Sequence, residues 1–449
     1  MPKLNALVAG STGYIGVQLI KLLIKHKFIN IKYLCGNSSV GKTISSYDKS
    51  LSAKKLPKII KFNKKLLKDV DVVFTALPNG EAQDISKHLT KNITLIDLAA
   101  DFRLEKGSAY LKWYKQKHRA VNLIKKSIYC LPEINGKDIG KYQIVSCPGC
   151  YPTSILLPLV PLFKKNLVKV NNIIMDSKSG YSGAGRGVHK KYKDKNLYES
   201  LSAYGVGFHR HNSEINQMLK KFTKKKLSFN FTPHLTPMSR GILSTIYIDL
   251  EKGITQSKII KTLKDFYKND DFVKILKANN LLSTNDVINT NNCFISVCKS
   301  KYKNKNLYES LSAYGVGFHR HNSEIDQMLK KFTKKKLGFN FTPHLTPMFR
   351  GILSTIYIDL EKSVTQSKII KTLTDFYKND DFVKILKANS LLSTNDVINT
   401  NNCFISVCKS KYKNKIVIIS AIDNLIKGGA GQAVQNLNMK FNFPIKTAL

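Results

Sequence analysis

The sequence predicts an α/β protein whose first domain is an open, mostly parallel sheet flanked by helices. Short apolar runs read as buried strands, at residues 4–10, 29–34, 71–77, 94–98 and 143–146. Each run ends in a distinctive turn, and ligands bind at the carboxyl ends of the strands in such sheets. From about residue 151 the pattern changes to glycine-rich loops and further strands, which indicates a second, α+β domain.

The first apolar run leads into a glycine-rich turn. Gly10, Gly13 and Gly16 lie between the expected strand and a helix. Glycines there permit a tight turn, close approach of the backbone to a phosphate, and close helix packing. An ordinary strand-to-helix turn is the alternative. We predict a dinucleotide site formed by Gly10, Ser11, Thr12, Gly13, Tyr14, Ile15 and Gly16.

The end of the second expected strand bears on the type of dinucleotide. An NAD site places Asp or Glu near this point to bind the ribose hydroxyls, but no acidic residue precedes Asp48. Ser38, Ser39 and Lys42 could instead receive a 2′-phosphate. The residues therefore favour NADP, with a polar surface loop as the alternative.

The stretch from Cys147 to Thr153 predicts a reactive cysteine. Pro148 and Gly149 force a turn after the strand at 143–146, and Pro152 suits the first turn of a helix. Cys150 would then face the positive end of a helix dipole, which favours thiolate over thiol. We predict that Cys150 is a nucleophile, with a buried structural cysteine as the alternative.

Composition limits the classes of partner. The net charge is +43, but 66 of the 73 basic residues are Lys, spread along the whole chain, which favours AT-rich codon usage over a nucleic-acid partner. No apolar run is long enough for a membrane span, and the N-terminus leaves no room for a signal peptide. Eight cysteines without framework spacing suggest a reducing compartment, so we expect a cytoplasmic protein.

Arginine is scarce, with seven residues in all, so its positions are informative. Its planar fork grips carboxylate or phosphate in a way that Lys does not reproduce. Arg186 ends a loop rich in glycine and hydroxyls that could cradle an anion, and Arg210 lies between His209 and His211. A zinc site at these histidines lacks a nearby third ligand, so we expect no metal.

The chain contains a near-identical internal repeat. Residues 196–305 recur at 306–415 with seven differences, which indicates a recent duplication or an assembly error. One of these differences places Phe349 where the first copy has Ser239. Without one copy, about 340 residues remain, a normal length for a two-domain enzyme.

Taken together, these stretches resemble the N-acetyl-gamma-glutamyl-phosphate reductase family. The resemblance spans the chain apart from one copy of the repeat, and Cys147, Asn37, Ser38 and the duplication depart from the family pattern. The matching stretches are 10–16, 76–80, 97–103, 131–134, 148–153, 182–186, 209–211, 233–238 and 431–438.

The resemblance implies reduction of an acyl phosphate, N-acetyl-glutamyl 5-phosphate, to its semialdehyde in arginine biosynthesis. Cys150 would form a thioester, NADPH would deliver hydride, and His211, in preference to His209, would act as general acid and base. The implied substrate-binding residues are Arg103, Arg186, Arg240 and Tyr204. The implied further cofactor-binding residues are Pro78, Ser182, Gly183 and Asn424.

The resemblance also implies a domain arrangement and a homo-oligomer, either a dimer or a tetramer. Residues 1–150 would form a Rossmann-type NADP-binding domain completed by the C-terminal helix at 425–449, and residues 151–424 an α+β catalytic and oligomerisation domain. We expect the first copy, with His209 and His211, to be catalytic, and His319 and His321 to be spare. The alternatives are an enzyme like aspartate-semialdehyde dehydrogenase and an inactive duplicated relic.

Overall fold

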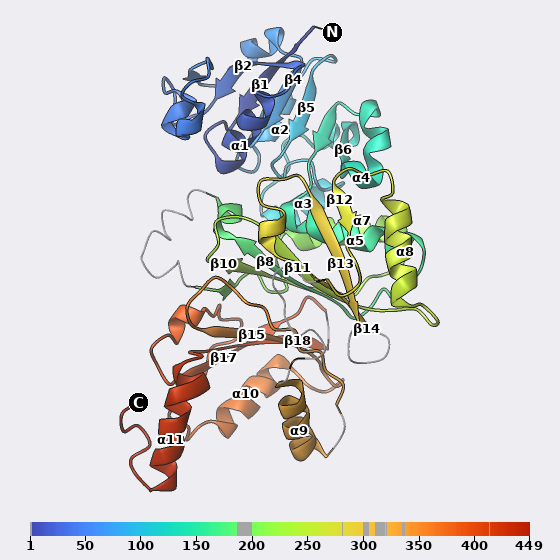
Figure 1. Cartoon of the computed structure of the whole chain (residues 1–449). Helices are drawn as coiled ribbons and strands as arrows, with labels where there is room; N and C mark the ends of the chain where they lie inside the picture. Colours follow the sequence, from blue (N-terminus) through green and yellow to red (C-terminus); the bar gives the residue numbers. More distant parts are fainter. Residues whose placement is uncertain are drawn as a thin grey trace. The chain divides into compact units, whose positions relative to one another are not determined.

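The computed structural model describes residues 2–185, 200–280, 282–299, 305–309, 319, 321–334, 337–412 and 414–449. The chain divides into two compact units (Figure 1). The first unit contains residues 1–153 and 213–218, and the second contains residues 154–212 and 219–449. Arg186 and Arg320 lie outside the described residues.

The first unit is built on one seven-stranded sheet in which all strand pairs are parallel. The spatial order is β3-β2-β1-β4-β5-β7-β6, which confirms the predicted open parallel sheet. The strands are β1 (Leu4–Ala9), β2 (Ile29–Cys35), β3 (Ile59–Ile60), β4 (Val72–Thr75), β5 (Thr94–Asp97), β6 (Ser127–Tyr129) and β7 (Ile144–Ser146).

Both faces of this sheet are covered, which explains why the strands read as continuous apolar runs. Leu7, Val73 and Leu95 belong to one buried cluster, while Ala6, Val8 and Ile20 belong to another. The helices of the unit are α1 (Tyr14–Leu23), α2 (Glu81–Ser86), α3 (Gly107–Tyr114), α4 (Pro132–Asn135) and the first turn of α5 (Cys150–Lys164).

The second unit contains a seven-stranded mixed sheet in the order β12-β13-β14-β11-β8-β10-β9. Helix α5 covers one face of this sheet, because Ser154 Oγ lies 2.7 Å from Ser244 Oγ on β11. The strands are β8 (Ile173–Gly180), β9 (Ser202–Ala203), β10 (Phe229–Thr236), β11 (Ile242–Asp249), β12 (Val273–Ile275), β13 (Cys293–Lys299) and β14 (Lys305–Glu309). The helices of this part are α8 (Gln256–Phe266) and the two ends of α7 (His211–Thr223), whose residues 213–218 belong to the first unit.

The second copy forms a separate four-stranded sheet in the order β15-β18-β17-β16. Its strands are β15 (Ile352–Asp359), β16 (Val383–Ile385), β17 (Cys403–Lys409) and β18 (Lys415–Ile422). Its helices are α9 (His321–Thr333) and α10 (Gln366–Phe376), and the chain ends with α11 (Gly431–Lys440).

The same position is filled by different strands in the two sheets. Lys305 pairs with Asp249 at the start of β14, and its counterpart Lys415 pairs with Asp359 at the start of β18. Each lysine is the last residue of its copy and pairs with the same aspartate of that copy. The residues after each lysine, although they differ in sequence, therefore continue the strand. In the first sheet, the first residues of the second copy therefore take the place that β18 has in the other sheet.

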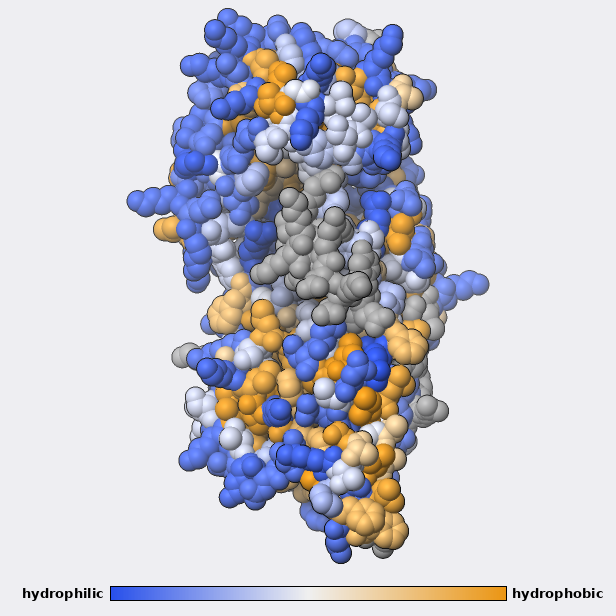
Figure 2. Space-filling view, turned by 90° about the vertical axis from the view of Figure 1, so that its left-hand side faces the viewer, coloured by the Kyte–Doolittle hydropathy of each residue, from blue (hydrophilic) through white to orange (hydrophobic). Residues whose placement is uncertain are grey.

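The second copy lacks a strand that the first copy uses. Strand β10 pairs with β8, which lies before the repeat and was not duplicated. The counterpart of β10, residues 339–346, consequently forms no strand beyond a bridge at His344. Helix α5 was not duplicated either, and Ile356 and Ile358 are exposed whereas their counterparts Ile246 and Ile248 are buried. Figure 2 shows apolar residues gathered over the second copy and the C-terminal segment.

The C-terminal helix lies in the second unit, whereas we expected it to complete the first. Gln435 of α11 accepts a hydrogen bond from Asn401 at 3.0 Å, and Lys446 pairs with Asp381 at 2.6 Å. Both partners belong to the second copy, whose sheet contains β18, the strand that leads to α11. The placement of β18 therefore determines the placement of residues 425–449.

Candidate active site

The glycine-rich turn joins β1 to α1 as predicted. At Gly10, φ is +81°, and an added Cβ would lie 2.2 Å from Ala76 O; at Gly16 an added Cβ would lie 2.2 Å from Gly10 O. These two glycines are required by the packing of the turn itself. An added Cβ at Gly13 would meet only Gly10 O, at 3.6 Å, so the fold does not require glycine there. Close approach of a phosphate to the start of α1 supplies a reason for Gly13, and the turn fits a dinucleotide.

The other residues of the turn differ in how far their side chains are exposed to a possible cofactor. Ser11 is fully buried, and its hydroxyl donates to Cys35 O at 3.1 Å. Its side chain therefore connects β1 to β2, and cofactor binding by Ser11 stays a prediction. Thr12 and Tyr14 are half-buried, and Ile15 is exposed at the start of α1.

The loop after β2 presents two polar side chains to solvent. Ser38 and Lys42 are exposed, whereas Ser39 is buried and its Oγ accepts a hydrogen bond from the Tyr47 hydroxyl at 2.7 Å. Of the three residues predicted to receive a 2′-phosphate, Ser38 and Lys42 are therefore the better placed. Pro78, in the turn after β4, is also exposed.

Cys150 is the first residue of α5, at the predicted strand-to-helix junction. Its side chain reaches solvent. Burial of the sulfur among protein atoms nevertheless raises the pKa of the thiol, and Arg103 and the backbone N–H of Tyr151 only partly oppose this effect. The N–H of Tyr151 at the helix terminus lowers the pKa, in the direction we expected, but burial outweighs it and the net shift disfavours the thiolate.

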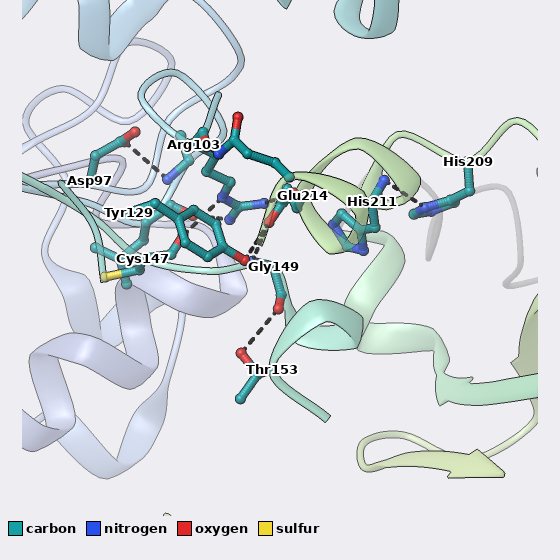
Figure 3. Close-up of polar contacts among 12 residues, drawn as sticks. Asp97, Arg103, Tyr129, Cys147, Gly149, Thr153, His209, His211 and Glu214 are labelled. Atoms are coloured by element: carbon teal, nitrogen blue, oxygen red, sulfur yellow. Dashed lines mark hydrogen bonds and ion pairs between the residues drawn. The ribbon is translucent and has the colours of Figure 1, made fainter. Parts of the chain in front are cut away.

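An ion pair between Arg103 and Glu214 lies beside the cysteine turn (Figure 3). Arg103 Nη1 lies 3.2 Å from Glu214 Oε1, and both side chains are buried. Arg103 Nε also donates to Cys147 O at 2.9 Å, and Nη2 donates to Leu98 O at 3.0 Å. Each nitrogen of the guanidinium thus makes a contact within the protein, so Arg103 positions the turn. Substrate binding by Arg103 stays a prediction.

Glu214 reaches the turn directly as well. Its Oε2 accepts hydrogen bonds from Gly149 N at 2.9 Å and from the Tyr129 hydroxyl at 3.2 Å. Burial and Glu214 raise the pKa of Tyr129, which keeps that phenol a donor. Glu214 and Arg103 therefore hold the backbone on the N-terminal side of Cys150 at two points, Gly149 N and Cys147 O.

Asp101 organises the neighbouring turn after β4. Its carboxylate accepts hydrogen bonds from Gly80 N at 2.7 Å, Gln83 Nε2 at 3.1 Å and the Tyr110 hydroxyl at 2.8 Å. These contacts join the turn at 78–80 to the loop that carries Arg103. The two turns can be joined in this way because β4 and β5, the strands that they follow, are neighbours in the sheet.

The histidines lie at the start of α7. His211 is the first residue of the helix, is buried, and donates its backbone N–H to His209 Nδ1 at 3.2 Å. The two rings lie 4.6 Å apart in an edge-to-face arrangement, and Tyr204 packs edge-on against His209 at 5.4 Å. His211 precedes Glu214 by three residues, so α7 carries both side chains (Figure 3).

The remaining predicted residues lie in the second unit. Ser182 and Gly183 lie in the short helix Tyr181–Ala184, where Ser182 N donates to Ser239 O at 3.1 Å. This contact joins them to the turn that carries Arg240, which is exposed and donates to Asn289. Asn424 accepts a hydrogen bond from Gly351 N in the second copy. Arg186, which was predicted with Arg240 to bind the substrate, lies outside the described residues.

The two copies place the same helix in different surroundings. Glu214 is fully buried at the cysteine turn, whereas its counterpart Glu324 on α9 is exposed. Sequence reasoning assigned no role to Glu214 or Tyr129. The one available signal was the position of Glu214 in the first turn of a helix that begins with a candidate catalytic histidine.

Further features limit the kinds of site. Among the described residues, no group of three or more His, Cys, Asp or Glu side chains could hold a metal ion. Within the same residues, no helix is long and apolar enough to cross a membrane.

Comparison with protein families matches both parts of the chain. Residues 5–142 match the semialdehyde dehydrogenase NAD binding domain. The semialdehyde dehydrogenase dimerisation domain matches twice, at residues 150–307 and 298–424. The double match reflects the repeat, and a dimerisation domain indicates a homo-oligomer.

Curated relatives are similar over most of their length. A probable chloroplastic N-acetyl-gamma-glutamyl-phosphate reductase of Arabidopsis thaliana is 42% identical over 64% of this chain and 72% of the relative. The N-acetyl-gamma-glutamyl-phosphate reductase of Thermoanaerobacter pseudethanolicus is 34% identical over 98% of this chain and 96% of the relative. The N-acetyl-gamma-glutamyl-phosphate reductase of Ehrlichia canis is 32% identical over 100% of this chain and 97% of the relative.

Solved structures share the fold at low identity. Aspartate semialdehyde dehydrogenase II from Vibrio cholerae has a TM-score of 0.51 at 14% identity, over 69% of this chain and 93% of that one. A probable aspartate-semialdehyde dehydrogenase from Pseudomonas aeruginosa gives the same values. These likenesses concern the fold alone.

Proposed function

The chain belongs to the N-acetyl-gamma-glutamyl-phosphate reductase family, and from this premise we propose what each part of its site does. The reaction is the reduction of N-acetyl-glutamyl 5-phosphate to N-acetyl-glutamate 5-semialdehyde and phosphate, a step of arginine biosynthesis. The observation that carries this assignment is the position of Cys150 on the first residue of α5, with Glu214 and Arg103 fixing the preceding turn.

The first half of the reaction is acyl transfer to the cysteine. Because burial raises the pKa of the Cys150 thiol, a base is needed to take its proton, and His211 is our candidate. The sulfur attacks the acyl carbon, the bond from that carbon to the phosphate oxygen breaks, and phosphate leaves. Arg240 is our candidate to hold the anionic groups of the substrate, with Arg103, Arg186 and Tyr204 kept as predictions. Ser182 and Gly183 stay predicted cofactor contacts.

The second half releases the aldehyde. When bound, the nicotinamide cofactor supplies the hydride that reduces the thioester carbon. His211 then returns its proton to the sulfur as the carbon–sulfur bond breaks, which restores the thiol and frees the semialdehyde. We assign Arg103 and Glu214 the role of holding the turn in place, through their contacts with Cys147 O and Gly149 N.

The first unit is an NAD(P)-binding domain, and we propose NADP as the cofactor. The absence of an acidic residue between β2 and Asp48 supports this choice, as do the exposed Ser38 and Lys42 in that loop. Gly13, where the fold itself leaves room, would allow the phosphates to approach α1. We also keep Asn424 as a proposed cofactor contact and the cytoplasm as the proposed location.

A comparison of substrates tests the function. We expect the purified chain to oxidise N-acetyl-glutamate semialdehyde with NADP+ and phosphate, and to turn over aspartate semialdehyde at least about 100-fold more slowly. Preference for aspartate semialdehyde would support the alternative enzyme. Absence of turnover with both, in a chain that binds NADP+, would support the inactive relic.

A further inference from the structure

Two hydrogen bonds in the second unit are related by the repeat. His234 Nε2 on β10 lies 2.9 Å from Thr355 Oγ1 on β15, and His344 Nε2 lies 2.8 Å from Thr245 Oγ1 on β11. His344 is the counterpart of His234, and Thr355 is the counterpart of Thr245, each 110 residues further along. Residue i of one copy therefore contacts residue j of the other, and j contacts i, as in an isologous two-fold interface.

The faces of the strands agree with this pairing. Side chains alternate between the two faces of a strand. On β11, Ser244 faces α5, so Thr245 faces the opposite way, toward the second copy. On β15, Thr355 and Tyr357 are half-buried, whereas Ile356 and Ile358 on the opposite face are exposed. The two copies thus bury the same face of the same strand against each other.

A buried charged cluster of the first copy's sheet also contacts the second copy. Asp176 Oδ1 lies 2.9 Å from Lys178 Nζ and 3.1 Å from His234 Nδ1, and all three side chains are buried. Lys178 Nζ also lies 3.5 Å from His344 Nδ1. Burial and Lys178 lower the pKa of His344 to about 3, so the ring is neutral and can accept from Lys178. The buried lysine of the first copy's sheet is therefore partly satisfied by the second copy.

A second set of contacts joins the two copies, at the segment of the first copy that precedes His209 and His211. Leu201 N donates to Thr394 Oγ1 at 3.2 Å, Thr394 N donates to Leu201 O at 3.2 Å, and Ser200 Oγ lies 2.5 Å from Ser393 Oγ. Ala203 and Val206 pack into an apolar cluster whose other buried members belong to the second copy and β18. The segment that leads to His209 and His211 is thus supported by the second copy.

We propose that the tandem copies form a pseudo-two-fold dimer within one chain, in which the second copy covers the sheet face and supports the histidine segment of the first. The second copy then acts as a partner subunit built into the chain, and one chain supplies both sides of this contact. Any oligomer of the whole chain would assemble through other surfaces. This inference does not depend on the reaction that the enzyme performs.

A disulfide in the full chain tests which segments are in contact. The 2.5 Å separation of the two hydroxyl oxygens makes S200C with S393C suitable for a disulfide on mild oxidation. Ser283 is the counterpart of Ser393 in the first copy, with the same capping box around it, so S200C with S283C is the matched control. We expect a disulfide in the first pair alone, in a product with the mass of one chain on a non-reducing denaturing gel.

Three results would overturn the proposal. Covalently linked pairs of chains from S200C with S393C would mean that the contact joins two molecules. A disulfide in S200C with S283C instead would mean that the segment packs on its own copy. Two unoxidised thiols in the folded S200C and S393C variant would mean that residues 200 and 393 are not in contact.

Double-mutant cycles on thermal unfolding give an independent check. T245V with H344L, and T355V with H234L, should lower the melting temperature by less than the sum of their single variants, because each pair loses one shared hydrogen bond. T245V with H234L, and T355V with H344L, share no direct hydrogen bond and are linked only through Asp176 and Lys178, so their departure from additivity should be smaller. Additive behaviour in all four pairs would overturn the two-fold contact.

Discussion

Glu214 and Gly149 are 65 residues apart in the sequence, and Glu214 Oε2 accepts the backbone hydrogen of Gly149 at 2.9 Å. Gly149 is the residue before Cys150. A carboxylate from helix α7 therefore fixes the backbone conformation just before the proposed nucleophile. The same carboxylate pairs with Arg103, which holds Cys147 O on the other side of the turn.

Glu214→Gln should damage both stability and turnover. The change leaves buried Arg103 without its counter-charge, which costs about 3–5 kcal/mol of unfolding free energy. A small displacement of Cys150 lowers kcat/KM on the order of 100-fold. Glu324→Gln, at the identical position of the second copy, is the matched control and should change neither. Equal effects of the two substitutions on unfolding and steady-state kinetics would contradict the proposed role of the first copy.

The histidine pair offers a similar comparison. His211→Ala should lower kcat by about 10²- to 10⁴-fold, the usual contribution of a general acid and base. His321→Ala, its counterpart on α9, should leave kcat near that of the unmodified chain. Loss of activity in the His321 variant alone would show that the second copy is the catalytic one, and loss in neither would show that the copies are interchangeable.

The protonation state of Cys150 predicts how its reactivity depends on pH. Because its pKa is raised above the ordinary thiol value, the thiolate fraction stays small near neutrality and grows as the pH rises. Alkylation of Cys150 by iodoacetamide, followed by peptide mass spectrometry, should therefore accelerate up to and beyond pH 9. Cys147, whose pKa burial raises to about 11, should react more slowly. A plateau in the Cys150 rate below pH 8 would contradict this account.

The loop after β2 should determine the preference for NADP. Lys42→Ala removes a charge that we place near the 2′-phosphate, and should raise KM for NADPH on the order of tenfold while leaving KM for NADH unchanged. Lys49→Ala, another exposed lysine beyond this loop, is the control for general charge effects. An equal change in KM for NADPH and for NADH, or no change in either KM, would show that Lys42 does not contact the 2′-phosphate.

Local patterns were sufficient to predict the parallel sheet, the glycine turn and the place of Cys150. Each depends on residues adjacent in sequence: apolar runs that form strands, Gly10 at a positive φ, and a proline that suits the first turn of a helix. The role of Arg103 was not predictable in this way. Its partner Glu214 is 111 residues distant, and only the fold brings the two side chains together.

The repeat shows a second limit of local reasoning. Residues 229–236 form β10, whereas residues 339–346, which have the identical sequence, form no such strand, because only the first copy lies beside β8. Residues that open the second copy become β14 because they follow Lys305, which already pairs with Asp249. In both cases the partner strand, and not the sequence of the segment, decides the structure.

The most direct test of the central claim is to trap the acyl group on Cys150. In the oxidative direction, N-acetyl-glutamate semialdehyde and NADP+ should form the thioester, which accumulates when phosphate is left out. Intact-protein and peptide mass spectrometry should then find one N-acetyl-glutamyl group on Cys150, with one equivalent of NADPH formed and the group released on addition of phosphate. An adduct on another residue, or an unmodified Cys150 in a chain that turns over normally when phosphate is present, would contradict the account.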